Sequence, residues 1–200
     1  MKEVIQESLK KAISYNDYKK LIINLLKEGR STGILQSEDL LNYTKLNEKR
    51  MKRLDKQTTL SEEAATKTQT IQKDFTWLVL TESWCGDAAQ TLPVINKFAE
   101  INPKIDLKVV SRDENENLMN QFLTNGSKSI PKLIVIEKET STVVSSWGPR
   151  SKVATKLVNE YKDKHGKLDA EFKKELQYWY NDDKGKSIEH DLVEFLNLMV

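Results

Sequence analysis

Apolar residues recur at helical spacing through the first part of the chain and predict two long helices. The first stripe is typical of an amphipathic helix that stops at Gly29; it comprises Tyr18, Leu21, Ile22, Leu25 and Leu26. Ser37 is a favourable N-cap for the second helix, whose stripe comprises Leu40, Tyr43, Asn47, Met51 and Leu54. We therefore expect residues 1–60 to form a helical N-terminal extension.

The middle of the chain alternates between strand and helix patterns. Strand-like runs cover residues 76–81, 105–110, 133–136 and 142–147. Helix-like segments cover residues 61–72, 87–101, 116–123 and 151–164. From residue 76 the order is β-α-β-α-β-β-α, which predicts parallel strands first and a hairpin last. We expect one α/β domain over residues 61–165.

The last segment, residues 166–200, carries two further helical patterns. Asp169 is a candidate N-cap for a helix that includes Phe172 and Leu176, and Ser187 is a candidate cap for the final helix. The apolar and aromatic residues of these helices favour packing over binding. We expect a helical C-terminal extension packed on the core.

Charge and composition exclude several classes of function. Lys and Arg number 32 against 30 Asp and Glu, and this balance gives no electrostatic case for a nucleic-acid or membrane partner. No stretch approaches the ~20 apolar residues that a membrane span requires. The N-terminus lacks an apolar signal core, and a single cysteine excludes an internal disulfide framework. These features predict a soluble, cytoplasmic protein.

The single cysteine, Cys85, lies between a predicted strand and a predicted helix. A thiol at a helix N-terminus is close to unpaired backbone N–H groups and to the positive end of the helix dipole, and both favour the thiolate. Asp87 has the opposite effect, because a carboxylate two residues away disfavours a second negative charge. The sequence alone leaves open which effect is larger.

The surroundings of Cys85 resemble the thioredoxin family. Trp84-Cys85-Gly86 is similar to the start of the family's active-site signature, and Pro93 occupies the place of the proline in its active-site helix. Further matches at family spacing are Gly126, the loop Ser129-Ile130-Pro131-Lys132, and Gly148. The resemblance covers residues 74–164 and implies a three-layer α/β/α fold with a mixed central sheet.

Four segments resemble a poorly characterised bacterial group within that family. They read Trp84-Cys85-Gly86-Asp87, Arg112-Asp113-Glu114-Asn115, Ser129-Ile130-Pro131 and Trp147-Gly148-Pro149-Arg150. The group resemblance is specific for fold and membership, and it leaves the substrate undefined.

Three departures from the family pattern restrict the chemistry. Ala88 stands where the family has its second cysteine, Asp87 replaces the proline of the signature, and Val79 replaces a buried carboxylate. An internal disulfide is therefore impossible. Any redox cycle must use one thiol.

The resemblance also implies roles for the residues around Cys85. Pro131 is expected to be cis and to lie against the cysteine, while the backbone of Ile130 pairs with an extended substrate. Trp84 would form an apolar wall, and Gly86 and Asp87 would support the site at the helix start. Trp147, Gly148 and Arg150 would lie on the same surface. Arg150 or Arg112 could bind a substrate carboxylate, although a structural ion pair is the favoured interpretation for each.

The leading functional hypothesis is a monothiol oxidoreductase that acts by thiol–disulfide exchange through Cys85. Its partner would be a protein or small molecule bearing a thiol or disulfide. An external thiol would complete the cycle, and no bound cofactor or metal is expected. One alternative is a non-catalytic thioredoxin-fold module that binds other proteins. Another is a single-thiol redox sensor.

Overall fold

The structure is a computed structural model that describes residues 1–199. Within them, one sheet has the strand order β1-β3-β2-β4-β5. Its strands are β1 (Ile13–Ser14), β2 (Phe75–Thr81), β3 (Ile105–Ser111), β4 (Lys132–Glu137) and β5 (Thr142–Trp147). β2 pairs parallel with β3 and antiparallel with β4, and β4 and β5 form the expected antiparallel hairpin. The predicted mixed sheet is confirmed.

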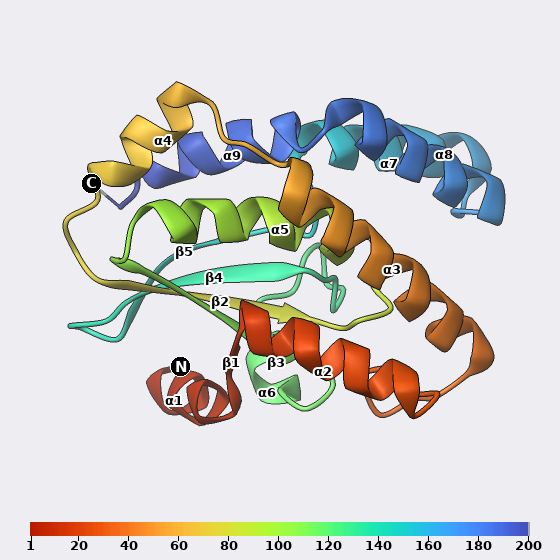
Figure 1. Cartoon of the computed structure of the whole chain (residues 1–200), viewed down its shortest axis with the longest axis horizontal. Coiled ribbons are helices and arrows are strands. Elements are labelled where there is room, and N and C mark those ends of the chain that lie inside the picture. Colours follow the sequence, from red (N-terminus) through yellow and green to blue (C-terminus); the bar gives the residue numbers. More distant parts are fainter. Residues whose placement is uncertain (200) are drawn as a thin grey trace.

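Helices cover both faces of this sheet, and the arrangement can be followed in Figure 1. On one side, α5 (Gly86–Ile101) lies directly on the sheet, and α4 (Glu62–Gln69) and α9 (Lys186–Leu196) pack against it from outside. On the other side lie α1 (Lys2–Lys11) and α6 (Glu116–Met119), which contact each other. The remaining helices are α2 (Tyr15–Lys27), α3 (Glu38–Gln57), α7 (Lys152–His165) and α8 (Ala170–Asp183).

The central strand β2 is buried along its whole length. β3 and β4 pair with it on either side and helices cover both faces of the sheet, so its side chains are buried on both faces without alternation. β2 ends at Thr81, and Cys85 follows four residues later, after the buried side chains of Glu82 and Ser83.

The sequence predicts the start of a helix correctly where the side chain of the N-cap residue accepts a hydrogen bond from the first turn. The Ser37 hydroxyl accepts the Leu40 N–H, and the Asp169 carboxylate accepts the Phe172 N–H, as an N-cap does. Ser187 does not cap the last helix. Lys184 and Gly185 turn the chain through left-handed conformations, α9 starts at Lys186, and the Ser187 hydroxyl contacts Asp183 and Ser151.

Two elements differ from the sequence-based expectation. Residues 1–60 are not entirely helical, because Ile13 and Ser14 pair antiparallel with β3. α6 ends at Met119 and does not reach residue 123. The chain after it forms a tight turn in which Thr124 pairs with Ser127 and Gly126 has positive φ.

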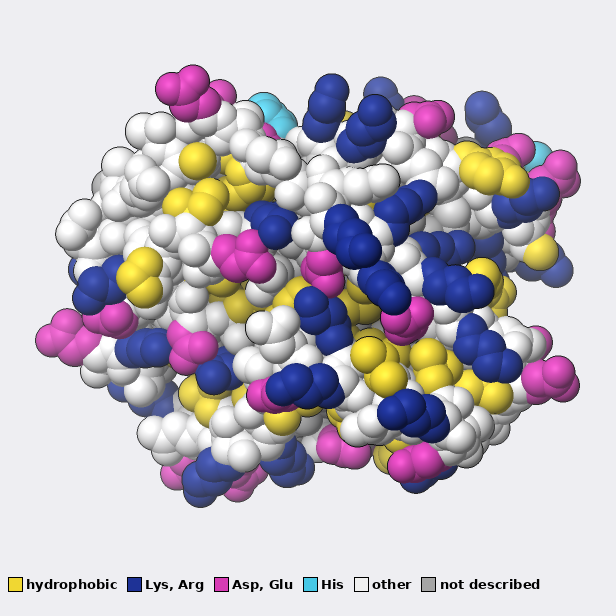
Figure 2. Space-filling view, viewed as in Figure 1, with side chains coloured by type: hydrophobic (Ala, Val, Ile, Leu, Met, Phe, Trp, Pro, Cys, Tyr) yellow, Lys and Arg dark blue, Asp and Glu magenta, His cyan; other side chains and the backbone are white. Residues whose placement is uncertain are grey.

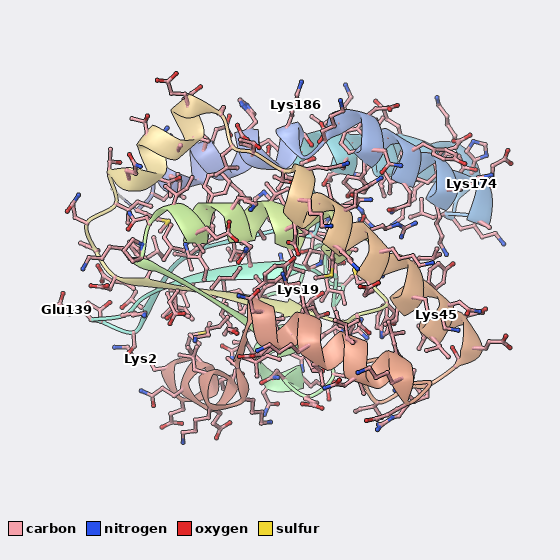
Figure 3. The ribbon with its side chains drawn as sticks, viewed as in Figure 1. Lys2, Lys19, Lys45, Glu139, Lys174 and Lys186 are labelled. Carbon is pink, nitrogen blue, oxygen red and sulfur yellow. The ribbon has the colours of Figure 1, made fainter. Side chains whose placement is uncertain are left out.

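The N-terminal helices are fixed to one another and to the core. Lys19 of α2 forms an ion pair of 2.8 Å with Asp55 of α3, and Figure 3 shows Lys19 between these helices. The Tyr15 hydroxyl donates a hydrogen bond to the same carboxylate. α3 in turn packs on α5. The domain boundaries at residues 60 and 165 stay a prediction.

None of the helices that the structure describes is at once long enough and apolar enough to cross a membrane.

Candidate functional site

Cys85 is the N-cap residue of α5, and its sulfur faces the loop before β4. The thiol donates a hydrogen bond to the Ile130 carbonyl, with Sγ and O 3.3 Å apart. The peptide bond between Ile130 and Pro131 is cis. The structure therefore brings Cys85 together with Ile130, 45 residues later in the chain, and with the adjacent Pro131.

Burial determines the protonation state of this thiol. Only 8% of the residue is exposed. Burial and the nearby Asp87 carboxylate raise the pKa of Cys85 from an ordinary 9.0 to about 12. The backbone N–H groups of Ala88 and Asp87, and the Arg150 guanidinium, act in the opposite direction without overcoming these effects. At neutral pH the resting sulfur is a thiol.

Asp87 is held by two partners from distant segments. Its carboxylate forms an ion pair with Arg150, at 2.6 Å, and accepts a hydrogen bond from the Tyr180 hydroxyl of α8, at 2.9 Å. Burial alone would lower the pKa of Arg150, but Asp87 and other negative groups raise it overall. Burial and Asp87 also raise the pKa of Tyr180. Arg150 is therefore an ion-pair partner of Asp87 in the first turn of α5.

α3 is tied to the turn that precedes Cys85. The Asn47 amide donates to the Ser83 carbonyl at 2.9 Å, and the Thr44 and Ser83 hydroxyls are 3.0 Å apart. Thr32, from the loop before α3, exchanges hydrogen bonds with both the backbone and the side chain of Ser83. All four residues are buried. The N-terminal segment thus fixes the turn that presents Cys85.

Two side chains from other helices lie close to Gly86, the residue after Cys85. A methyl group placed on Gly86 would lie 3.3 Å from Gln177 Nε2 of α8 and 3.7 Å from Arg50 Nη1 of α3. Gln177 is positioned by a hydrogen bond from the Gln90 amide of α5. Both extensions therefore reach the start of the active-site helix.

The other predicted site residues take separate positions. Trp84 is half-buried, and the Arg112 guanidinium lies 5.0 Å from its ring centre. Arg112 is also paired with Asp113. The Trp147 indole N–H donates to Asp191 of α9, so this side chain faces the C-terminal extension.

Gly148 is required by its surroundings. It has φ of +110°, and an added Cβ would lie 2.3 Å from the Pro131 carbonyl oxygen. Only glycine combines this backbone conformation with such close approach. Gly148 therefore supports the loop that holds Pro131 against Cys85.

Two of the three positions that depart from the family pattern, Val79 and Ala88, are part of the apolar core. Val79 and Ala88 are both buried, with exposed fractions of 0% and 2%. A different buried carboxylate, Glu82, lies three residues before Cys85 and accepts hydrogen bonds from Ser111 and the Asp113 backbone. Burial raises the pKa of Glu82.

Sequence reasoning missed Glu82, Tyr180, Gln177 and Arg50 as neighbours of the site. A signal existed for Glu82, because an acid directly after a continuous apolar strand is unusual. Arg50 belongs to a basic segment, residues 49–53, whose spacing of charged and apolar residues is typical of a solvated helix face rather than a site. The other two are on α8, and nothing local indicates which face of that helix meets α5.

The described residues contain no group of three or more His, Cys, Asp or Glu side chains suited to a metal ion.

Comparisons with known proteins identify the class. A family model described as Thioredoxin matches residues 33–162. This match spans more than half of the chain, so the protein belongs to the thioredoxin family. No curated protein matches.

Two solved structures share the fold at low sequence identity. One is the crystal structure of an HIV epitope-scaffold, with 17% identity and a TM-score of 0.57 over 93% of this chain and 97% of that chain. The other is a protein of unknown function from Pseudomonas aeruginosa, with 16% identity and a TM-score of 0.56 over 93% of this chain and 96% of that chain. At these identities the likeness shows the fold alone, and it extends beyond the α/β core to most of the chain.

Proposed function

We propose that this thioredoxin-family protein is a monothiol exchange protein that acts through Cys85. The observation that carries the proposal is the position of the sulfur, between the first turn of α5 and the carbonyl of Ile130 beside Pro131. An incoming disulfide that displaced the Ile130 contact would meet the sulfur at a helix N-terminus, where backbone N–H groups stabilise the thiolate.

The exchange needs no redox partner beyond its two substrates, a disulfide and an external thiol. Cys85 loses its proton, its sulfur attacks one sulfur of a disulfide, and a Cys85 mixed disulfide forms while the other half leaves as a thiolate that takes up a proton. A second external thiol then attacks the mixed disulfide, and Cys85 is released as a thiol. One disulfide is consumed and one is formed, so electrons balance.

The raised pKa limits the rate of this cycle in the resting protein. Because burial and Asp87 raise the pKa of Cys85 to about 12, very little of the resting protein carries the thiolate at pH 7. Exchange is therefore slow until a partner engages the site and changes the environment of the sulfur. The protein is a candidate enzyme only in that engaged state.

The test is catalysed release of a fluorescent small thiol from a mixed disulfide with an unrelated protein, in the presence of a second small thiol. We expect catalytic amounts of the wild-type protein to accelerate release above the background set by the small thiol. Cys85→Ser should leave only that background. Equal rates for the two proteins would exclude the exchange function.

The covered thiol favours one second candidate, a non-catalytic module that binds other proteins. Its specific support is that Cys85 is buried and protonated while Ala88 replaces the resolving cysteine. This candidate predicts that wild type and Cys85→Ser retain the same partners from a lysate under reducing conditions. Partners that are retained only by the wild type, and only until a reductant is added, would exclude it.

A further inference from the structure

Two arginines of α3 face α8 without a carboxylate partner among residues 1–199. Arg50 donates to Asn47, and Arg53 donates to Asn181 of α8 at 2.6 Å; both acceptors are neutral amides. The other three arginines, Arg30, Arg112 and Arg150, each pair with an acid. Within residues 1–199, Arg50 and Arg53 are thus the arginines that form no ion pair with a carboxylate.

The environment of these two side chains is donor-rich and partly desolvated. Burial and the nearby Arg53 charge lower the pKa of Arg50. The Nε of Arg53 is buried and has no hydrogen-bond partner. Figure 2 shows Lys and Arg side chains gathered along α3 and toward the C-terminal helices. Two like charges held close together at a partly buried edge destabilise each other, and an anion bound between them would remove that cost.

The same edge adjoins the thiol. Arg50 Nη1 and Gln177 Nε2 are the atoms that an added Cβ on Gly86 would meet, and Gly86 follows Cys85 in the chain. The side-chain carbonyl oxygen of Gln177 accepts a hydrogen bond from Gln90. The side-chain N–H groups of Gln177 remain to donate to a ligand. Donors from α3 and α8 therefore converge beside Gly86, the residue that follows Cys85.

We propose that Arg50, Arg53 and Gln177 form an anion subsite that binds the carboxylate of a low-molecular-weight disulfide while its sulfur reacts with Cys85. This inference rests on the proposed exchange function and adds the substrate class to it. A guanidinium suits a carboxylate because it offers two parallel N–H donors.

The test compares three small disulfides of different charge: dithiodiglycolate, which is dianionic, 2-hydroxyethyl disulfide, which is neutral, and cystamine, which is dicationic. The rate of mixed-disulfide formation with Cys85 is followed by intact mass. Each rate is divided by the rate for the same reagent with the denatured protein, which removes intrinsic reactivity. We expect the normalised rate to be highest for dithiodiglycolate and lowest for cystamine.

Arg50→Gln should reduce the normalised preference for dithiodiglycolate over the neutral disulfide by about tenfold, since it removes a charge-assisted contact. Lys49→Gln is the matched control, because it removes one positive charge from an exposed position of the same helix. It should change the preference by less than about twofold. Equal losses in the two variants, or no preference in the wild type, would overturn the subsite.

A binding experiment separates this inference from the exchange function. Cys85→Ser protein is titrated with dithiodiglycolate and followed by NMR of the arginine and glutamine side-chain N–H groups. Shifts at Arg50 and Gln177, which weaken with added salt, support the subsite even where no exchange is detected. Absence of such shifts contradicts it, whether or not Cys85 reacts, and this readout in the Cys85→Ser protein does not require Arg50→Gln to fold.

Discussion

The carboxylate of Asp87 disfavours the negatively charged form of Cys85 and stabilises the positively charged form of Arg150. It is the largest cause after burial of the raised pKa of the thiol, and it is the partner of the Arg150 guanidinium. A residue that suppresses the thiolate is therefore also the one that anchors Arg150. The site combines low resting reactivity with structural order.

Asp87→Asn should separate these two effects. Loss of the negative charge lowers the pKa of Cys85, so alkylation at about pH 8 should become up to about tenfold faster. Loss of the carboxylate leaves the Arg150 guanidinium without its ion-pair partner. This should reduce the free energy of unfolding by about 1–3 kcal/mol. Iodoacetamide labelling and urea denaturation measure the two quantities.

The exposed Asp163 provides the control for this change. Asp163→Asn should alter neither the labelling rate nor the stability beyond about 0.5 kcal/mol. A labelling rate in Asp87→Asn no faster than in wild type would show that Asp87 does not suppress the thiolate.

The raised pKa of Cys85 also makes stability depend on pH. The folded protein holds the thiol proton up to about pH 12, whereas an unfolded chain releases it near 9.0. Between these values the folded state binds more protons, so this contribution is complete below pH 9.0 and is lost as the pH rises toward 12. The stability of wild type relative to Cys85→Ala should therefore fall over this window. A difference that is constant from about pH 8 to about pH 11 would contradict the assignment.

At the scale of elements, α3 positions the turn that carries Cys85. Asn47→Ala removes the amide that satisfies the buried Ser83 carbonyl and also the partner of Arg50. It should cost about 1–3 kcal/mol and expose the thiol, so that labelling becomes faster. Asn42→Ala, on the exposed face of the same helix, should change neither measurement. Slower labelling in Asn47→Ala would contradict this role of α3.

The loop that carries Pro131 depends on Gly148. Gly148→Ala would place a methyl group 2.3 Å from the Pro131 carbonyl at a φ of +110°. It should cost about 3 kcal/mol or more, because strain and a backbone clash add. Gly166→Ala shares a positive φ but has nothing within 4 Å, and it should cost only about 1 kcal/mol. Equal decreases in Tm for the two variants would contradict this, because they would show that the clash with the Pro131 carbonyl costs no stability.

Elements set by local chemistry were predictable from the sequence, and those set by distant partners were not. Ser37 and Asp169 can be recognised as N-caps from the sequence. Each side chain accepts a hydrogen bond from an N–H group only three residues later, so the whole interaction is local. Ile13 and Ser14 form a strand only because β3 lies beside them.

The same distinction applies to the site. Cys85, Ile130 and Pro131 could be predicted through a family resemblance. Tyr180 could not, since its contact with Asp87 spans 93 residues and no local pattern marks which face of α8 is buried. The pKa of Cys85 also depends on burial by whole elements, which the sequence near the cysteine does not encode.

For the whole molecule, three separate parts of the chain meet at the start of α5. α3 fixes the turn before Cys85, α8 brings Tyr180 and Gln177 to the residues after it, and the loop before β4 supplies the acceptor for the thiol. The extensions on both sides of the α/β core therefore belong to the candidate site. Together they hold Cys85 as a covered, protonated thiol, and this is the central claim to test.

The most direct test is the rate of Cys85 alkylation as a function of pH, measured in the native protein and in denaturant. We expect native labelling to be slower than denatured labelling near neutral pH. It should still be rising above pH 9.0, where the denatured thiol levels off, because the native pKa is about 12. Fast native labelling that levels off below the denatured pKa would contradict the central claim, because it would show an exposed and activated thiolate in the resting protein.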